Sequence, residues 1–210
     1  MQTLFISGTG TNVGKTYTTL KLIEAFGAKG FKVGVYKPIE TGVTDQPLDA
    51  AILLDACQKV NYTFENFTPQ EVTAYTFTLP AAPFCADVQQ QIDFNTIIQK
   101  HEALKSQCDI LLVEGAGGLM VPITKDMMMI DLAQKFEAKV LLVTSSRLGC
   151  INETLLSIEA LKQRNIPFEW CVNLHEEKSS FAEVIQPFYD AVFPDWWSLE
   201  EGLQRFINRY

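Results

Sequence analysis

The sequence lacks the features that several large classes of protein require. None of its apolar runs reaches the ~18 residues needed to span a bilayer. The N-terminus has no basic region, and its apolar stretch is too short for a signal peptide. Basic residues are scarce, because 17 Lys and Arg stand against 25 Asp and Glu and give a formal net charge of −8. These absences disfavour a nucleic acid or a membrane surface as a partner and indicate a cytoplasmic protein.

Cysteine and histidine are too scattered to form an obvious metal or nucleophile site. The cysteines are odd in number, have no paired metal-ligand spacing and lie among apolar residues; they are Cys57, Cys85, Cys108, Cys150 and Cys171. This pattern predicts reduced, structural thiols. The two histidines, His101 and His175, are isolated, and His101 falls on a polar helical pattern, which predicts solvent exposure.

The first apolar segment, residues 4–6, is followed by a phosphate-binding loop. Residues 8–16 read Gly-Thr-Gly-Thr-Asn-Val-Gly-Lys-Thr and precede an amphipathic helix. In such a loop the backbone N–H groups and the helix N-terminus bind phosphate, Lys15 reaches the β- and γ-phosphates, and Thr16 binds Mg²⁺. The usual spacing puts four residues between the two glycines, whereas five separate Gly8 from Gly14. The extra residue points to a particular branch of nucleotide-binding proteins.

Strand and helix patterns alternate along the chain. Short runs with β-branched residues predict further strands at 31–36, 110–113, 140–144 and 168–172. Helical periodicity fits 16–28, 49–58, 94–106, 131–137, 152–163, 181–192 and 199–208. The alternation predicts an α/β fold with a doubly wound, mostly parallel sheet, a three-layer sandwich like that of P-loop nucleoside-triphosphate hydrolases, in a single domain over residues 1–210. The segment 61–86 is predicted to be a loop excursion over one sheet edge.

Polar residues at the carboxyl ends of the strands are the candidates for the site, because ligands bind there in such sheets. Lys37, followed by Pro38, is predicted to end the second strand and to face the γ-phosphate side of the loop. Glu114 follows the strand at 110–113, where a carboxylate can hold Mg²⁺. Asp49 begins a helix, and the sequence leaves open whether it reaches the metal or only favours the helix dipole.

Two later strand ends supply further candidates. The residues Gly149, Cys150, Ile151 and Asn152 would form a helix N-terminus suited to a carboxylate, with ordinary capping by Asn152 as the alternative. Asn173 has the donor and acceptor that suit a purine edge, and it equally suits a turn.

Four stretches together resemble dethiobiotin synthetase, the ATP-dependent carboxylase of biotin synthesis. They are the loop at 8–16, Tyr-Lys-Pro-Ile-Glu-Thr-Gly at 36–42, Val-Glu-Gly-Ala-Gly-Gly at 113–118 and Leu-Gly-Cys-Ile-Asn at 148–152. Tyr75-Thr76-Phe77 with Pro80 and Pro83 also resembles the family's middle segment. The longer phosphate loop and the Lys37-Pro38 pair are typical of that family, and the match runs to about Asn173.

The resemblance implies a magnesium-dependent cyclo-ligase that uses 7,8-diaminopelargonate, CO₂ and ATP. One amine takes up CO₂ to form a carbamate, whose oxygen attacks the γ-phosphate of ATP. The second amine then closes the ureido ring and expels phosphate, giving dethiobiotin and ADP. An anionic carbamate is already a nucleophile, so the reaction needs positioning and charge neutralisation rather than a His or Cys base.

The resemblance also implies roles for individual residues. Lys15 and Lys37 would be catalytic and stabilise charge on the transferring phosphoryl group. The nucleotide would be bound by Gly10, Thr11, Asn12, Val13, Gly14, Lys15, Thr16, Glu114 and Asn173, with Asn173 at the adenine. Mg²⁺ would be held by Thr16, Asp49 and Glu114. The substrate would contact Thr11, Lys37 and Thr41 at its amino or carbamate end, and Gly149, Cys150, Ile151 and Asn152 at its carboxylate. In the family this last segment comes from the other subunit, so a homodimer is implied.

The chain departs from the family pattern in three places. Gly10 and Asn12 stand where the family often has acidic residues. Residues 193–197, Phe-Pro-Asp-Trp-Trp, replace a strand end that helps to enclose adenine. Selectivity among ATP, CTP and GTP therefore stays open, and Trp196 and Trp197 are predicted to be packed aromatic residues.

ATPases that act as switches in plasmid partition or septum positioning are the main alternative, because they share this fold. Those proteins carry a second lysine early in the phosphate loop. Gly8-Thr9-Gly10 contains none, which counts against this class.

Overall fold

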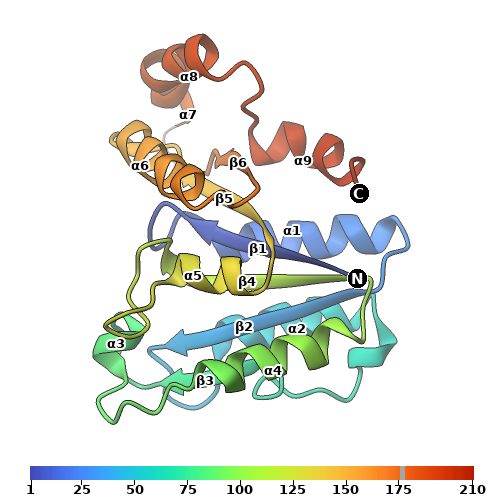
Figure 1. Ribbon diagram of the computed structural model, residues 1–210. Helices are drawn as coiled ribbons and strands as arrows, with labels where there is room; N and C mark the ends of the chain where they lie inside the picture. The colour runs from blue at the N-terminus through green and yellow to red at the C-terminus, as the bar shows by residue number, and fades with distance from the viewer. Residues whose placement is uncertain (176–177) are drawn as a thin grey trace.

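The computed structural model describes residues 1–175 and 178–210, and it contains one six-stranded sheet in the order β3-β2-β4-β1-β5-β6 (Figure 1). The strands are β1 (Gln2–Gly8), β2 (Val33–Thr41), β3 (Thr73–Phe77), β4 (Ile110–Gly118), β5 (Lys139–Ser145) and β6 (Phe168–Asn173). All the ladders between them are parallel. The prediction of an α/β fold with a doubly wound parallel sheet is therefore confirmed.

Helices cover both faces of the sheet and give three layers (Figure 1). One face carries α1 (Lys15–Ala28), α2 (Leu48–Gln58) and α9 (Leu199–Ile207), and α1 packs on both of the others. The opposite face carries α4 (Phe94–Lys105), α5 (Met129–Lys135) and α6 (Cys150–Gln163). Among the residues described, no helix combines the length and apolarity that a membrane crossing requires.

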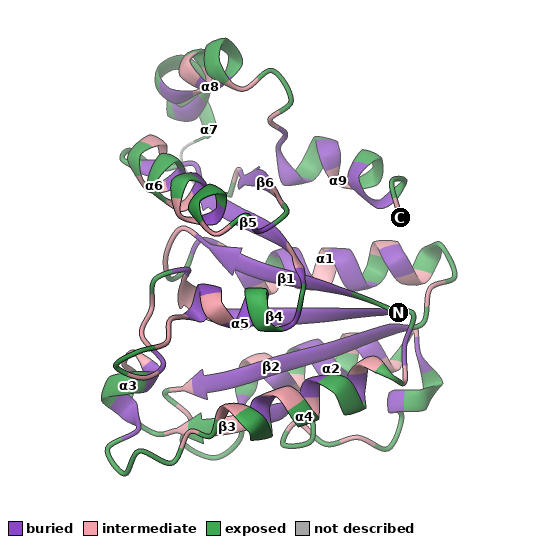
Figure 2. Cartoon of the chain, viewed as in Figure 1, coloured by how far each residue is buried: buried purple, intermediate pink, exposed green. Residues whose placement is uncertain are grey.

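The central strands form the core because they are covered on both sides (Figure 2). Leu4, Phe5 and Ile6 of β1 are fully buried, as are the apolar residues of β4 and β5 beside them. Continuous apolar runs are typical of parallel strands covered on both faces. This core fixes the carboxyl ends of β1, β2 and β4 next to one another, and the polar residues there form the site.

The second strand is longer than the sequence indicates. Lys37 does not end it, because β2 continues to Thr41 and the Lys37 N–H donates to the Val72 carbonyl at 2.9 Å. Pro38 does coincide with the end of the ladder to β4, whose last pair is Tyr36 with Val113. Proline has no N–H to donate, and in a parallel strand successive residues bond to opposite neighbours. The strand therefore stays paired on its β3 side only.

The interpretation of residues 61–86 as a loop excursion was wrong in part. The segment contains the edge strand β3, the short 3₁₀ turn η1 (Tyr62–Phe64) and the short helix α3 (Pro83–Ala86). The burial of β3 does not alternate regularly, since Thr73 is buried, Thr76 is exposed and the three other residues are partly buried, so its apolar signal is weak. Its backbone pairing with β2, rather than a hydrophobic run, makes it a strand.

The predicted exposure of His101 was also wrong. His101 is fully buried, its ring stacks on Phe136 with centroids 4.0 Å apart, and its Nε2 lies 3.0 Å from the Thr3 hydroxyl. Its Nδ1 lies 2.9 Å from a Glu102 carboxylate oxygen, which can only accept, so Nδ1 carries the proton and Nε2 accepts from Thr3. Burial, opposed by Glu102, lowers the pKa of His101.

The C-terminal part departs from one regular helix over 181–192. It consists of α7 (Lys178–Ser180), a π-helical turn η2 (Phe181–Ile185) and α8 (Gln186–Val192). The prediction of packed tryptophans is confirmed. Trp197 is buried against Phe206, and the ring centroids of Trp196 and Phe181 are 5.7 Å apart. All five cysteines are unpaired, and four of them are buried, with Cys85 exposed.

Candidate active site

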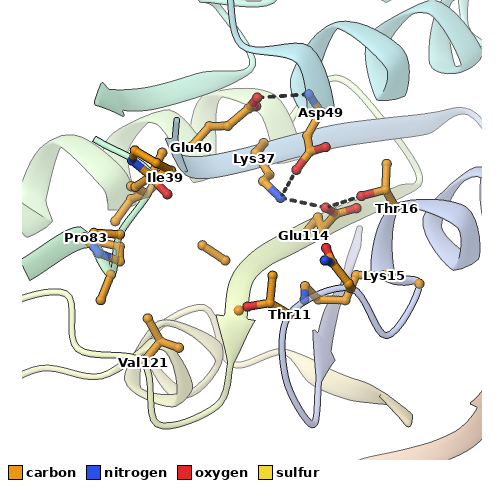
Figure 3. A pocket seen from close by; sticks show the side chains of 18 of the residues that line it. Thr11, Lys15, Thr16, Lys37, Ile39, Glu40, Asp49, Pro83, Glu114 and Val121 are labelled. Atoms are coloured by element: carbon orange, nitrogen blue, oxygen red, sulfur yellow. Dashed lines mark hydrogen bonds and ion pairs between the residues drawn. The ribbon is translucent and has the colours of Figure 1, made fainter. Parts of the chain in front are cut away.

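A cleft of about 760 Å³ opens beyond the carboxyl ends of β1, β2 and β4 (Figure 3). Its polar half is lined by Thr11, Asn12, Gly14, Lys15, Thr16, Tyr17, Lys37, Glu40, Thr41, Asp49 and Glu114. Its apolar half is lined by Ile39, Pro80, Ala81, Ala82, Pro83, Ala116, Gly117 and Val121. The cleft thus joins a charged, phosphate-loop side to a wall of apolar side chains.

The phosphate loop has the conformation that its glycine requires. Gly14 is the N-cap of α1 with φ +94°, a left-handed conformation that favours glycine. The Lys15 ammonium donates to the Gly10 carbonyl at 2.8 Å and so spans the loop. Burial and the neighbouring Lys37 lower the pKa of Lys15 to about 8. Burial and the like charge of Lys37 thus outweigh the opposing effect of Glu114 and Asp49 on Lys15.

Asn173, at the end of β6, packs directly on the phosphate loop. Its Nδ2 donates to the Val13 carbonyl at 3.2 Å, and a Cβ on Gly14 would lie 1.9 Å from the same nitrogen. Neither Asn173 nor Val13 lines the cleft. Asn173 therefore supports the shape of the loop, and its contact with adenine stays a prediction.

Three charged residues meet in the middle of the cleft (Figure 3). The Lys37 ammonium lies 2.6 Å from Glu114 Oε1 and 2.8 Å from Asp49 Oδ2. Glu114 is 0% exposed, and its two oxygens also accept from the hydroxyls of Thr16 and Thr19, both at 2.9 Å. Burial by itself would lower the pKa of Lys37, but the two carboxylates outweigh it and raise that pKa. Lys37 is thus held fully protonated beside the loop.

The donor set in this cluster fits Mg²⁺. Thr16, Asp49 and Glu114 supply only oxygen ligands, the type that this ion prefers. Within residues 1–175 and 178–210, no three His, Cys, Asp or Glu side chains gather into a metal-binding group. Two carboxylates and a hydroxyl suit an ion that takes its remaining ligands from nucleotide oxygens and water.

Glu40 is a residue of the cleft that the sequence reasoning missed. It is 6% exposed, and its two carboxylate oxygens accept from the N–H groups of Asp49 and Ala50 at 2.9 and 3.0 Å. A signal was present, because Pro47 precedes α2 and no Ser, Thr, Asp or Asn stands there to cap it. The sequence could show that a cap was needed, but not which distant residue supplies it.

The segment Gly149–Asn152 lies outside the cleft, although it is the helix N-terminus that was predicted. Gly149 is the N-cap of α6 with φ +97°, and no side chain caps the helix, so the alternative of capping by Asn152 was wrong. Asn152 is exposed, whereas Cys150 is buried and 3.5 Å from the Tyr189 hydroxyl. Next to this segment Leu148 is 80% exposed, and Leu155 and Leu156 are exposed on α6 as well.

Fold and site together define a P-loop nucleotide-binding protein. The family model for an AAA domain matches residues 2–177. Among solved structures, the MinD cell division protein of Aquifex aeolicus is similar with a TM-score of 0.54 and 19% identity, covering 100% of this chain and 87% of that one. A ParA family ATPase from Chlorobium tepidum is similar with a TM-score of 0.55 and 12% identity, covering 93% and 83%. At these identities the likeness shows the fold alone.

Curated relatives narrow the class to one family. An ATP-dependent dethiobiotin synthetase of a Sulfurovum species is 63% identical over 99% of both chains. The enzyme of that name from Wolinella succinogenes is 41% identical over 90% of this chain and 88% of its own. The chain belongs to the ATP-dependent dethiobiotin synthetase family. The predicted resemblance is therefore confirmed, and the partition and septum-positioning class remains a relative in fold.

Proposed function

We propose that this protein catalyses the ATP-dependent closure of the ureido ring of dethiobiotin from 7,8-diaminopelargonate and CO₂, a ligase reaction of biotin biosynthesis. The observation that carries the proposal is the position of Lys37. It lies at the carboxyl-end edge of the sheet, faces the phosphate loop and is held by Asp49 and Glu114 (Figure 3). Two buried lysines, Lys15 and Lys37, thus converge on the same cleft.

The chemistry asks the protein for charge neutralisation and alignment. A carbamate oxygen is already negative, so it attacks phosphorus without a general base, and charge is spread over the phosphoryl oxygens in the transition state. Lys15, spanning the loop, neutralises the phosphate side. Lys37 would contact both the carbamate and the phosphoryl group that it attacks. Neither His101 nor His175 is among the residues that line the cleft, as this reaction allows.

Thr16, Asp49 and Glu114 would hold the Mg²⁺ that accompanies ATP. When bound, the ion would neutralise negative charge on the phosphate oxygens. In the structure the Lys37 ammonium neutralises these two carboxylates. We infer that the Lys37 ammonium turns from them toward the substrate during the reaction, which would leave the oxygens of Asp49 and Glu114 to the ion.

The two halves of the cleft suit the two kinds of surface on the substrate. Thr11 and Thr41 lie on its polar side and would bind the amino or carbamate end with Lys37. The wall formed by Ile39, Pro83 and Val121 would take part of the alkyl chain (Figure 3). Asn173 would meet the adenine beyond the loop.

The substrate carboxylate would be received by Gly149–Asn152 of a second subunit, which makes the active form a homodimer. Two observations support this part of the proposal. The segment is a helix N-terminus, which attracts anions, yet it does not line the cleft of its own chain. Leu148, Leu155 and Leu156 beside it leave apolar surface that a symmetric partner would cover.

Phosphate release from ATP tests the proposal directly. Release should depend on both diaminopelargonate and bicarbonate, and running it with ATP, CTP and GTP also determines base selectivity. Lys37→Gln should abolish turnover, whereas Lys59→Gln, which changes an exposed lysine paired with Asp55 on α2, should leave it unchanged. Nucleotide hydrolysis that ignores the diamine, or full activity of Lys37→Gln, would contradict the proposal.

A further inference from the structure

The helix that carries Asp49 begins without a cap of its own. Pro47 precedes α2 and offers no side-chain acceptor. The first bond within the helix runs from the Ala51 N–H to the Pro47 carbonyl at 2.9 Å. The N–H groups of Asp49 and Ala50 are therefore left over, as at every helix start, and need partners from elsewhere.

Glu40 supplies both partners from a neighbouring strand. It stands in β2, three residues after Lys37, and its carboxylate accepts from Asp49 N–H at 2.9 Å and from Ala50 N–H at 3.0 Å (Figure 3). The side chain is 6% exposed. Burial raises the pKa of Glu40, although the two hydrogen bonds act to lower it. A buried carboxylate that bonds two N–H groups at a helix N-terminus is a strong, directional contact.

Asp49 depends on this contact more than the other members of the site do. Its side chain is 42% exposed, whereas that of Glu114 is fully buried and held by two hydroxyls. The side-chain contact of Asp49 is to Lys37, at 2.8 Å, which the proposed mechanism releases. Once Lys37 moves, the backbone of the first turn of α2 is what holds Asp49 in place, and Glu40 holds that backbone.

We propose that Glu40 is a positioning residue for the metal: it fixes the first turn of α2 and so sets where the Asp49 carboxylate meets Mg²⁺. The inference rests on the proposed function, in which Asp49 is a ligand. The contacts of both Glu40 oxygens are to backbone N–H groups at the start of α2, so the role proposed for Glu40 is exerted through Asp49. Residues that orient metal ligands commonly change metal affinity by about 10–100-fold when replaced.

The test compares how strongly Mg²⁺ promotes nucleotide binding. The dissociation constant of a non-hydrolysable ATP analogue is measured by calorimetry in EDTA and in Mg²⁺, and the ratio of the two constants is the readout. In Glu40→Gln one oxygen becomes an NH₂ group that faces a backbone N–H, so the ratio should fall about tenfold. Glu71→Gln is the matched control, because Glu71 also accepts a backbone N–H, from Thr68 at 2.7 Å, in an exposed turn.

A double-mutant cycle distinguishes the positioning role of Glu40 from the role of Asp49 as a metal ligand. Asp49→Asn should lower the same ratio, and Glu40→Gln should add nothing in that background. If Asp49→Asn alone has no effect, the metal role of Asp49 in the proposed function fails. If Asp49→Asn acts but Glu40→Gln does not, or if the effect of Glu40→Gln persists undiminished beside Asp49→Asn, the positioning role is overturned.

Amide hydrogen exchange tests the contact in the unaltered protein and does not depend on any variant folding. The Asp49 and Ala50 amides should be protected, although a helix cannot pair them itself. Exchange of these two amides at the rate of an unstructured peptide would also overturn the inference.

Discussion

At the scale of single residues, Lys37 has two tasks that are separable by experiment. It is proposed to act on the substrate, and in the structure it neutralises Glu114 and Asp49. A buried carboxylate that loses its cation is destabilising, because its charge is then left without a partner in a poorly solvated place. The effect of a substitution on activity must therefore be distinguished from its effect on folding.

We expect Lys37→Gln to lower the free energy of unfolding by about 3 kcal/mol in the absence of Mg²⁺ and nucleotide. Adding Glu114→Gln should recover much of this loss, because the buried charge is then removed as well. Urea unfolding of the two single variants and the double variant measures the coupling. Equal stability of wild type and Lys37→Gln would show that the site is solvated well enough to need no counter-charge.

His101 should make stability depend on pH. Its pKa is lowered in the folded protein, mainly by burial, with Lys105 acting in the same direction and Glu102 against it. The unfolded chain therefore takes up a proton first as the pH falls below about 6.5, and each unit of difference in pKa corresponds to about 1.4 kcal/mol. The free energy of unfolding should fall from pH 7 towards pH 5, down to the folded pKa.

His101→Gln provides the comparison for this prediction, since glutamine does not titrate. The difference in unfolding free energy between wild type and His101→Gln should shift in favour of the variant as the pH falls. Urea unfolding at several pH values gives that difference and cancels the contributions of the carboxylates that both proteins share. Parallel curves for the two proteins would show that His101 is protonated as easily inside the fold as outside it.

The sequence predicted those site residues whose position follows from chain order. Lys15, Thr16, Lys37, Glu114 and Asp49 are brought together in the cleft because each stands at or near the carboxyl end of a parallel strand. Glu40 also stands near the carboxyl end of β2, but its partners could not be predicted in this way, and neither could those of His101. Their partners are set by tertiary packing, which neither residue type nor local periodicity records.

At the scale of elements, two helices of the proposed site begin in the same way. Both α1 and α6 have a glycine in the left-handed region as N-cap and no side-chain cap. The surroundings of the two glycines differ, since a Cβ on Gly14 would meet Asn173 at 1.9 Å, whereas one on Gly149 would have no atom within 4 Å. Replacing Gly149 therefore introduces backbone strain alone, whereas replacing Gly14 introduces the same strain together with a steric clash.

We expect Gly149→Ala to cost about 1–2 kcal/mol of unfolding free energy, which is the backbone strain alone. Gly14→Ala should cost clearly more, and Asn173→Ala in that background should remove the excess but not the strain. Urea unfolding of these variants is the measurement. If Gly14→Ala and Gly149→Ala cost the same, Asn173 yields without penalty and does not support the loop.

The elements that the sequence missed are those with weak periodicity. β1 and β5 are continuous apolar runs in the middle of the sheet and were predicted close to their observed positions, whereas β4 was predicted at 110–113 and continues to Gly118, so Glu114 lies within the strand and not after it. β3 pairs with β2 alone, has polar and exposed positions, and was overlooked. The π-helical turn η2, in the segment predicted as one helix over 181–192, likewise has no periodic signature that distinguishes it from α-helix.

At the scale of the whole molecule, the two halves of the proposed substrate site lie on different surfaces of the chain. Lys37 lies in the cleft, and Asn152 lies exposed in the first turn of α6, outside it. The proposed function therefore needs a second chain to enclose the substrate from both ends. A two-fold arrangement in which each subunit supplies Lys37 to one site and Asn152 to the other meets this requirement.

Complementation between two inactive variants tests this arrangement. Lys37→Gln removes the cation proposed to be catalytic, and Asn152→Asp places a negative charge where the substrate carboxylate is proposed to bind, while leaving the N-terminus of α6 at least as stable. Each variant alone should be nearly inactive at low diamine concentration. In a heterodimer both defects fall in one site and the other site is intact, so random reassortment should restore about one quarter of wild-type activity. Activity that does not rise on mixing, under conditions where subunits are shown to exchange, would place both residues in a site within one chain.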